Sequence, residues 1–204
     1  MALEDLGMIT LYHAPRSRSS RIIWLLEELE TPYQIKRVTI RRRDGSGALD
    51  PSNPHPHAKV PAIEDNGALI FESAAIAVYL TDAFPKNGIG PVVGEPTRGR
   101  YLTWLAYYTG VAEPAFISKI MNFEPPRGSA GWVAADEVMA YVTGTLQAGP
   151  YLLGSRFSAA DVLFGSTFAL FLGQPLLPKT PLLEAYVNRC TERPAYKLAT
   201  SKDG

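Results

Sequence analysis

A proline, a glutamate and a serine lie close together in residues 57–80, which read HAKVPAIEDNGALIFESAAIAVYL. Pro61 cannot donate a backbone hydrogen bond, and a cis Val60–Pro61 bond would turn the N–H and C=O of Val60 outward, where an extended peptide can pair with them. Glu72 offers a negative charge to an ammonium group. The hydroxyl of Ser73, together with the first N–H groups of a helix, offers a site for a carboxylate. These residues therefore describe a receptor for a small peptide that carries an amine and a carboxylate at one end.

A small α/β framework is needed to position these groups, and the first part of the chain predicts one. The runs Met8–Tyr12 and Tyr33–Val38 read as strands that flank a helix over 22–29, which makes a βαβ unit with parallel strands. An Asp-Asn-Gly turn at 65–67 then predicts a tight antiparallel hairpin. The next helix covers 73–84, so the receptor residues lie around the hairpin and at the start of this helix.

The second half of the chain reads as helix and turn throughout. One helical segment covers 98–116. Further on, Ser158 and Asp161 predict a capping box that begins a deeply buried helix, with Asp161 reaching back to the N–H of the cap. We assign Asp161 wholly to structure for this reason. Pro181 opens the last clear helix, which ends before Pro194.

A Gly/Pro-rich linker at 85–96 separates the two halves. We therefore expect an α/β domain over 8–85 and an all-helical domain over 97–200. A chain of 204 residues has room for both.

The composition narrows the class of protein. Lys+Arg and Asp+Glu are equal at 20 each, which argues against a general attraction to nucleic acid or to a membrane surface. No apolar run has the length of a membrane span, and the acidic start MALEDLGM reads as a loose leader rather than a secretory signal. The single cysteine excludes an internal disulfide framework and suits a reducing compartment. We therefore expect a cytoplasmic protein.

The order and spacing of these motifs resemble the glutathione transferase family, in particular its serine-type, bacterial and theta-like members. The resemblance extends from Met8 to about Lys197, and rests on Val60-Pro61-Ala62-Ile63, Glu72-Ser73-Ala74-Ala75-Ile76, Ser158-Ala159-Ala160-Asp161 and the tail from Tyr186 to Ala195. It implies a thioredoxin-like N-terminal α/β domain (βαβ-ββα), an all-α helical-bundle C-terminal domain, and usually a homodimer.

The resemblance also implies glutathione as the cosubstrate. Val60, beside Pro61, would pair with the cysteinyl backbone of glutathione. Glu72 and Ser73 would grip its γ-glutamyl end. A small hydrophobic electrophile would be the second substrate, chosen by the helical domain.

A hydroxyl is needed to activate the thiol of glutathione, because the thiolate is the nucleophile and a free thiol titrates at about 8.5. A donor to the sulfur near a helix N-terminus favours the charged form. Aligning SRSSRIIWLLEEL with the serine-type members places Ser17 at their catalytic serine, with Ser19 as the second choice. Arg18 falls where cysteine-type members have their cysteine, so a glutaredoxin-like mixed disulfide is not expected. Without the resemblance, Ser17 would read as a helix N-cap.

The histidines invite a metal interpretation, but no carboxylate or cysteine accompanies them at ligand spacing. We therefore expect no metal, and solvated side chains at His13, His55 and His57. His57 and Lys59 precede Val60, in a stretch that the family often uses to meet the glycine carboxylate of glutathione.

An aromatic cluster near residue 105 raises the question of the electrophile site, for which the candidates are Trp104, Tyr107 and Tyr108. Such a stripe is more often core than pocket. Tyr107 and Tyr108 cannot both face inward, because neighbours on a helix point about 100° apart. Tyr108 is the preferred pocket residue.

The functional hypothesis is conjugation of glutathione to small apolar electrophiles. Glutathione-dependent peroxide reduction, isomerisation or ether cleavage on the same site is an alternative within enzymology. A protein that binds glutathione as a stress-associated adaptor, without chemistry, is an alternative from another class.

Overall fold

The computed structural model describes residues 8–204, so most of the expected leader lies outside the described residues. The chain forms two compact units, one made of the residues up to Asn87 together with Pro194–Gly204, and the other of Gly88–Arg193. The end of the chain thus belongs with the first unit, whereas the sequence assigned everything from 97 to 200 to the helical domain.

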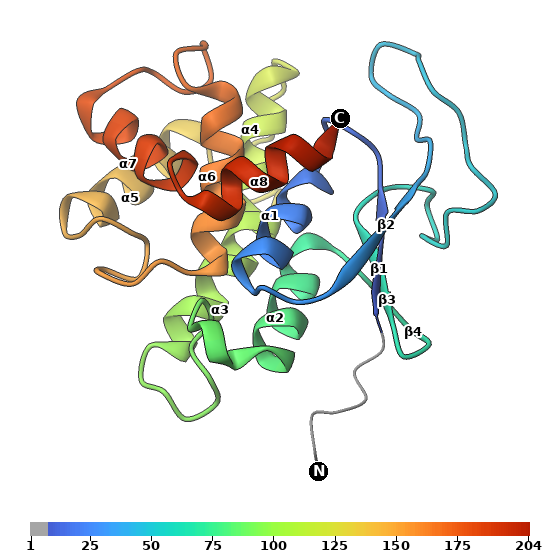
Figure 1. Ribbon diagram of the computed structural model, residues 1–204. Helices are drawn as coiled ribbons and strands as arrows, with labels where there is room; N and C mark the ends of the chain where they lie inside the picture. Colours follow the sequence, from blue (N-terminus) through green and yellow to red (C-terminus); the bar gives the residue numbers. More distant parts are fainter. Residues whose placement is uncertain (1–7) are drawn as a thin grey trace. The chain divides into compact units, whose positions relative to one another are not determined.

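A four-stranded mixed sheet forms the framework of the first unit (Figure 1). Its order is β2-β1-β3-β4, with β1 at Ile9–His13, β2 at Tyr33–Arg37, β3 at Ala62–Asp65 and β4 at Ala68–Phe71. β1 and β2 are parallel, while β3 is antiparallel to both β1 and β4. The predicted βαβ unit and hairpin are therefore confirmed.

The hairpin turn has the backbone that its sequence predicts. Asn66 and Gly67 have φ angles of 48° and 79°. Positive φ at both central residues is typical of a type I′ turn, which Asn-Gly adopts with little strain.

Within residues 8–204, the helices that accompany this sheet are α1 at Ser20–Glu28, α2 at Ser73–Ala83 and α8 at Pro194–Asp203, with a short 3₁₀ turn, η1, at Pro85–Asn87. The sequence pattern did not predict α8. This helix lies along α1 (Figure 1), where the ring of Tyr196 meets the buried ring of Trp24 edge-on at a centroid distance of 5.0 Å. Packing on α1 thus explains why α8 belongs with the first unit.

The second unit is helical within the described residues. Its elements are α3 at Arg98–Tyr107, a π-helical turn η2 at Tyr108–Ala112, α4 at Glu113–Ile120, α5 at Ala135–Gln147, α6 at Ala159–Phe171 and α7 at Pro181–Thr191. No helix within residues 8–204 is both long and apolar enough to cross a bilayer.

The predicted helix over 98–116 is interrupted by η2 and continues to Ile120. Pro114 explains the interruption, because proline has no N–H and its ring crowds the carbonyl of the preceding turn. A π turn widens the helix just before that residue and relieves the crowding.

The capping interaction at the start of α6 is confirmed. The backbone N–H and the hydroxyl of Ser158 donate to Asp161 Oδ2 at 2.9 and 3.0 Å. The N–H of Leu152 and the hydroxyl of Tyr186 donate to Oδ1 at 3.0 and 3.1 Å. Burial raises the pKa of Asp161 to about 6, while these donors favour the charged form. Asp161 therefore joins the start of α6 to α7 and to the preceding loop.

Candidate functional site

Ser17 lies in the loop between β1 and α1 and is half-buried. Its hydroxyl donates to the carbonyl of Ala14 at 2.7 Å, lies 2.8 Å from Ser19 Oγ, and accepts the N–H of Ser19 at 3.2 Å. Ser19 holds the N-cap position of α1, but its side chain makes no capping hydrogen bond. Ser17 therefore does not cap the helix, and its hydroxyl lies just before the N-terminus of α1.

The Val60–Pro61 peptide bond is cis. Among the described residues, neither the N–H nor the C=O of Val60 has a hydrogen-bond partner. Asn53 holds the loop that leads to it, since its side-chain amide donates to the carbonyl of Lys59 at 3.0 Å and its Oδ1 accepts the N–H of His55 at 3.1 Å. The backbone groups of Val60 are thus available to an extended peptide, as β-strand addition requires.

Glu72 joins β4 to α2 in an unusual backbone conformation, with φ 70° and ψ 124°. A residue other than glycine in this region carries strain of about 1–3 kcal/mol, and such residues cluster at functional sites. The Glu72 side chain is exposed. Ser73 is the first residue of α2, and its hydroxyl has no hydrogen-bond partner among residues 8–204. A carboxylate at this helix start would meet the hydroxyl of Ser73 and the first N–H groups of α2.

A shared apolar cluster brings these segments together. Ala14, Val60 and Ala62 are buried in one cluster, and Phe71 packs against it. Because Ala14 precedes Ser17 in its loop and Phe71 precedes Glu72, the three predicted parts of the site converge on this cluster. The pairing register of β1 with β3 also brings the Ser17 loop close to Val60, since Tyr12 of β1 pairs with Ala62 of β3.

His55 strengthens the link between the Val60 loop and β4. Its ring lies 5.0 Å from the ring of Phe71. Burial lowers the pKa of His55, while the charge of nearby Glu72 acts in the opposite direction. The N–H of His57 donates to Nδ1 of His55 at 3.1 Å. The side chains of His57 and Lys59 are exposed, and their contact with a carboxylate stays a prediction.

The expectation of solvated histidines is wrong for His13 and His55, which are 0% and 6% exposed. His13 stands at the end of β1, where Nδ1 lies 2.8 Å from Ser19 Oγ and Nε2 lies 3.2 Å from the carbonyl oxygen of Asp203. Sequence reasoning missed this interaction because Asp203 comes from a helix that it did not predict. Within residues 8–204 no histidine joins a group of potential ligands that could hold a metal ion.

The aromatic candidates lie in the helical unit. Trp104 and Tyr108 are almost fully buried, and the Tyr108 hydroxyl lies 2.6 Å from Thr167 Oγ1. Tyr107 is half-buried and meets the exposed ring of Tyr141 edge-on at 5.3 Å. Their role toward an electrophile stays a prediction, and Tyr107 is the most accessible of the three.

A four-stranded mixed sheet with a cis proline before β3, followed by a helical unit, defines a two-domain protein with a thioredoxin-like N-terminal domain and an all-α C-terminal domain. Residues 7–82 match the family description "Glutathione S-transferase, N-terminal domain", and residues 132–194 match "Glutathione S-transferase, C-terminal domain". The chain belongs to the glutathione S-transferase family.

Individual relatives agree with this assignment. Glutathione S-transferase 3 of Schizosaccharomyces pombe is 26% identical over 216 residues, which cover 96% of this chain and 88% of the relative. A crystal structure of a glutathione transferase from Methylococcus capsulatus is 28% identical with a TM-score of 0.77, and the match covers 97% of this chain and 99% of that one. A sphingomonad glutathione S-transferase, solved in complex with glutathione, is 25% identical with a TM-score of 0.75 and covers 96% and 98%.

Proposed function

We propose that this protein is a serine-type glutathione transferase that conjugates the thiolate of glutathione to small apolar electrophiles. The observation that carries the proposal is the convergence of the Ser17 loop, Val60 and the Glu72-Ser73 segment on one apolar cluster. Each of these segments offers groups suited to a different part of the tripeptide. The glutathione bound by the sphingomonad relative supports the same ligand here.

The proposed mechanism divides binding from activation. Val60 pairs with the cysteinyl backbone, while Glu72 meets the α-ammonium and Ser73 meets the α-carboxylate of the γ-glutamyl residue. Ser17 turns its hydroxyl from the carbonyl of Ala14, which it contacts at 2.7 Å, to the sulfur. A donor to the charged sulfur and the positive end of α1 both favour the thiolate. The thiolate then attacks the electrophile and forms the C–S bond.

The helical unit has the role of choosing the electrophile in this proposal, with Tyr107, Tyr108 and Trp104 as the candidate contacts. A homodimer and a cytoplasmic location are further predictions from the family. Peroxide reduction, isomerisation and ether cleavage would use the same thiolate.

The test compares Ser17→Ala with the wild type and with Ser129→Ala, a control at an exposed loop serine of the helical unit. Ser17→Ala should bind glutathione almost normally, because Val60, Glu72 and Ser73 hold the peptide. The pKa of the bound thiol should rise, and each unit of that rise lowers the thiolate fraction about tenfold at a pH well below the pKa.

The thiolate is followed by its ultraviolet absorbance, and turnover by a panel of aryl halides, enones, isothiocyanates and hydroperoxides. If the thiolate absorbance and turnover fall in Ser19→Ala but not in Ser17→Ala, Ser19 is the donor to the sulfur. Glutathione binding without turnover of any substrate would favour a non-catalytic binding protein. Absence of glutathione binding would overturn the proposal.

A further inference from the structure

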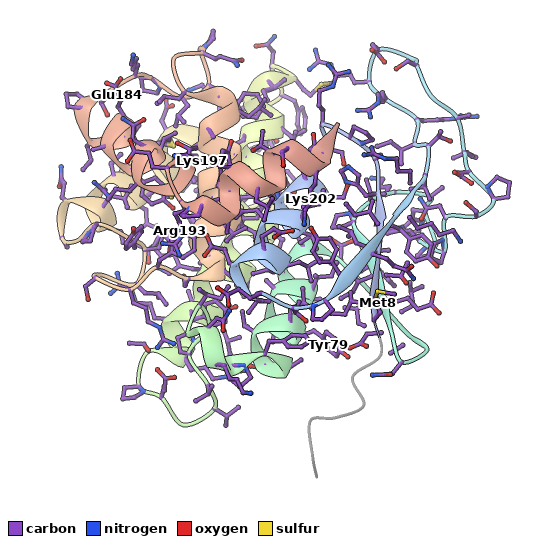
Figure 2. The ribbon with its side chains drawn as sticks, in the orientation of Figure 1. Met8, Tyr79, Glu184, Arg193, Lys197 and Lys202 are labelled. Carbon is purple, nitrogen blue, oxygen red and sulfur yellow. The ribbon has the colours of Figure 1, made fainter. Side chains whose placement is uncertain are left out.

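A continuous chain of polar contacts runs from the end of α8 to Ser17. Nε2 of His13 lies 3.2 Å from the carbonyl oxygen of Asp203, and Nδ1 lies 2.8 Å from Ser19 Oγ. Ser19 Oγ in turn lies 2.8 Å from Ser17 Oγ. His13 and Ser19 are both fully buried, so water does not compete for the contact between them. Lys202, which Figure 2 labels, immediately precedes Asp203 in the last turn of α8.

The chemistry of the partners sets the direction of these hydrogen bonds. A carbonyl oxygen can only accept, so Nε2 of the neutral ring carries the proton and donates it to Asp203. Nδ1 is then the acceptor, and the hydroxyl of Ser19 donates to it. The ring therefore presents an unprotonated nitrogen to the serine that contacts Ser17.

The Asp203 carboxylate supplies a counter-charge for the ring. Its Oδ1 is buried, has no hydrogen-bond partner among the described residues, and lies 3.6 Å from Nε2 of His13. Its Oδ2 accepts the N–H of Arg16 at 3.0 Å, which ties the same carboxylate to the loop that carries Ser17. A buried carboxylate oxygen without a donor is costly, and a protonated imidazole beside it would reduce that cost.

The other charged group that acts on His13 is Arg37 of β2, whose guanidinium donates to the oxygen of Gly204 at 2.6 Å. Burial lowers the pKa of His13 and Arg37 lowers it further, while Asp203 acts in the opposite direction. The ring is therefore neutral near pH 7 in the free protein. A thiolate formed nearby adds a negative charge and would favour the protonated ring.

We propose that His13, backed by Asp203, takes up the proton of the glutathione thiol through Ser19 and Ser17. This inference rests on the proposed function. The S–H bond breaks and its electron pair stays on sulfur, while the proton passes to Ser17 Oγ. The former proton of Ser17 passes to Ser19 Oγ, and the former proton of Ser19 passes to Nδ1 of His13. No atom is gained or lost, and the products are a thiolate and an imidazolium beside the Asp203 carboxylate.

His13 does not touch the substrate, so it is a positioning residue that acts through the two hydroxyls. After the transfer, Nδ1–H donates to Ser19 and Ser19 donates to Ser17, which leaves the Ser17 proton to the sulfur. The two hydrogen bonds between Nδ1 of His13 and Ser17 reverse and then point toward the thiolate, while Nε2–H still donates to the carbonyl of Asp203. Removal of His13 should therefore change where the thiol proton goes, and not only how well the loop is held.

The test counts protons. Calorimetric titration of glutathione into the full chain, in two buffers of different ionisation enthalpy, gives the protons released per molecule bound, and ultraviolet absorbance gives the thiolate formed. If His13 takes up the proton, the wild type releases much less than about one proton per thiolate formed. His13→Gln keeps a donor for the carbonyl of Asp203 but cannot accept a proton, so it should release about one proton per thiolate formed.

Asp203→Asn is the second variant, because it keeps the backbone contact to His13 and can still accept the N–H of Arg16. Like His13→Gln, it should release more protons per thiolate formed than the wild type. Glu30→Gln, a control at an exposed residue just after the C-terminal end of α1, should release as many as the wild type. Equal release per thiolate in the wild type and in both variants would overturn the inference and leave the proposed function intact. Absence of glutathione binding in the wild type would overturn both.

Discussion

Replacement of Asp161 by alanine should destabilise the fold while leaving the glutathione site unchanged. Asp161 is fully buried in the helical unit and accepts from Ser158, Leu152 and Tyr186. The candidate site residues Ser17, Val60, Glu72 and Ser73 belong to the other unit. A large effect on stability with none on affinity is therefore expected.

The expected magnitude follows from the donors left without an acceptor. Asp161→Ala removes the cap of α6, worth about 1 kcal/mol. It also leaves the N–H groups of Leu152 and Ser158 and the hydroxyl of Tyr186 without this acceptor, and each such buried group costs about 1–3 kcal/mol. Removal of a buried charge offsets part of this loss. We expect a net decrease of about 2–4 kcal/mol in the free energy of unfolding, which is a large share of the roughly 5–15 kcal/mol of a typical domain.

The assay is urea unfolding followed by circular dichroism, with glutathione affinity measured by calorimetry on the folded fraction. Asp136→Ala is the matched control, because Asp136 also lies in the first turn of a helix but pairs with Lys119 at the surface. The control should lose less than about 1 kcal/mol. An Asp161→Ala variant that is as stable as the wild type but does not bind glutathione would refute this assignment of Asp161 to structure.

Two further predictions concern the ligand site and pH. Glu72→Gln and Ser73→Ala should each raise the dissociation constant of glutathione about 10- to 100-fold in calorimetry, because each removes a charge-assisted contact. Ser73→Ala should also change the free energy of unfolding by less than about 0.5 kcal/mol, because the Ser73 hydroxyl has no hydrogen-bond partner within residues 8–204. For Asp161, the pKa of about 6 in the folded protein exceeds the ordinary aspartate value of 3.8, so the native state binds more protons than the unfolded state between these values. The contribution of Asp161 to stability therefore falls as pH rises through about 6. The difference in unfolding free energy between the wild type and Asp161→Asn should show this slope, and a flat difference would contradict the raised pKa.

Local signals predicted most of the fold. Asn66-Gly67 favours a tight hairpin turn, and Ser158 with Asp161 favours a helix cap. Each pair therefore predicts where an element begins or ends without tertiary information. The π turn before Pro114 and the helix α8 were not predicted. A proline inside a helix has several outcomes, and the chosen one depends on packing. α8 opens with Pro194 after a break and owes its position to contacts with α1, which lies far away in sequence.

The candidate site divides in the same way. The sequence predicts Val60, Glu72 and Ser73 as site residues because a proline after a loop and a helix start can both be recognised from neighbouring residues. The surroundings of His13 depend on Asp203, at a sequence separation of 190 residues, and no pattern near His13 indicates it. Asn53 was missed because an asparagine before a proline in a turn-rich loop reads as a turn residue, although it is buried and orders the approach to Val60.

The membership of α8 in the first unit has a consequence for the order of events during synthesis on the ribosome. The thioredoxin-like unit is discontinuous in sequence, since Pro194–Gly204 emerges only after the whole helical unit has been translated. Until then, the face of α1 that carries Trp24 has no Tyr196 to cover it, and His13 has no Asp203. The nascent first unit therefore presents an uncovered apolar helix face, the kind of surface that chaperones hold. A ribosome that stops short of residue 194 releases a chain in which both units are nearly complete and the surroundings of Ser17 are not.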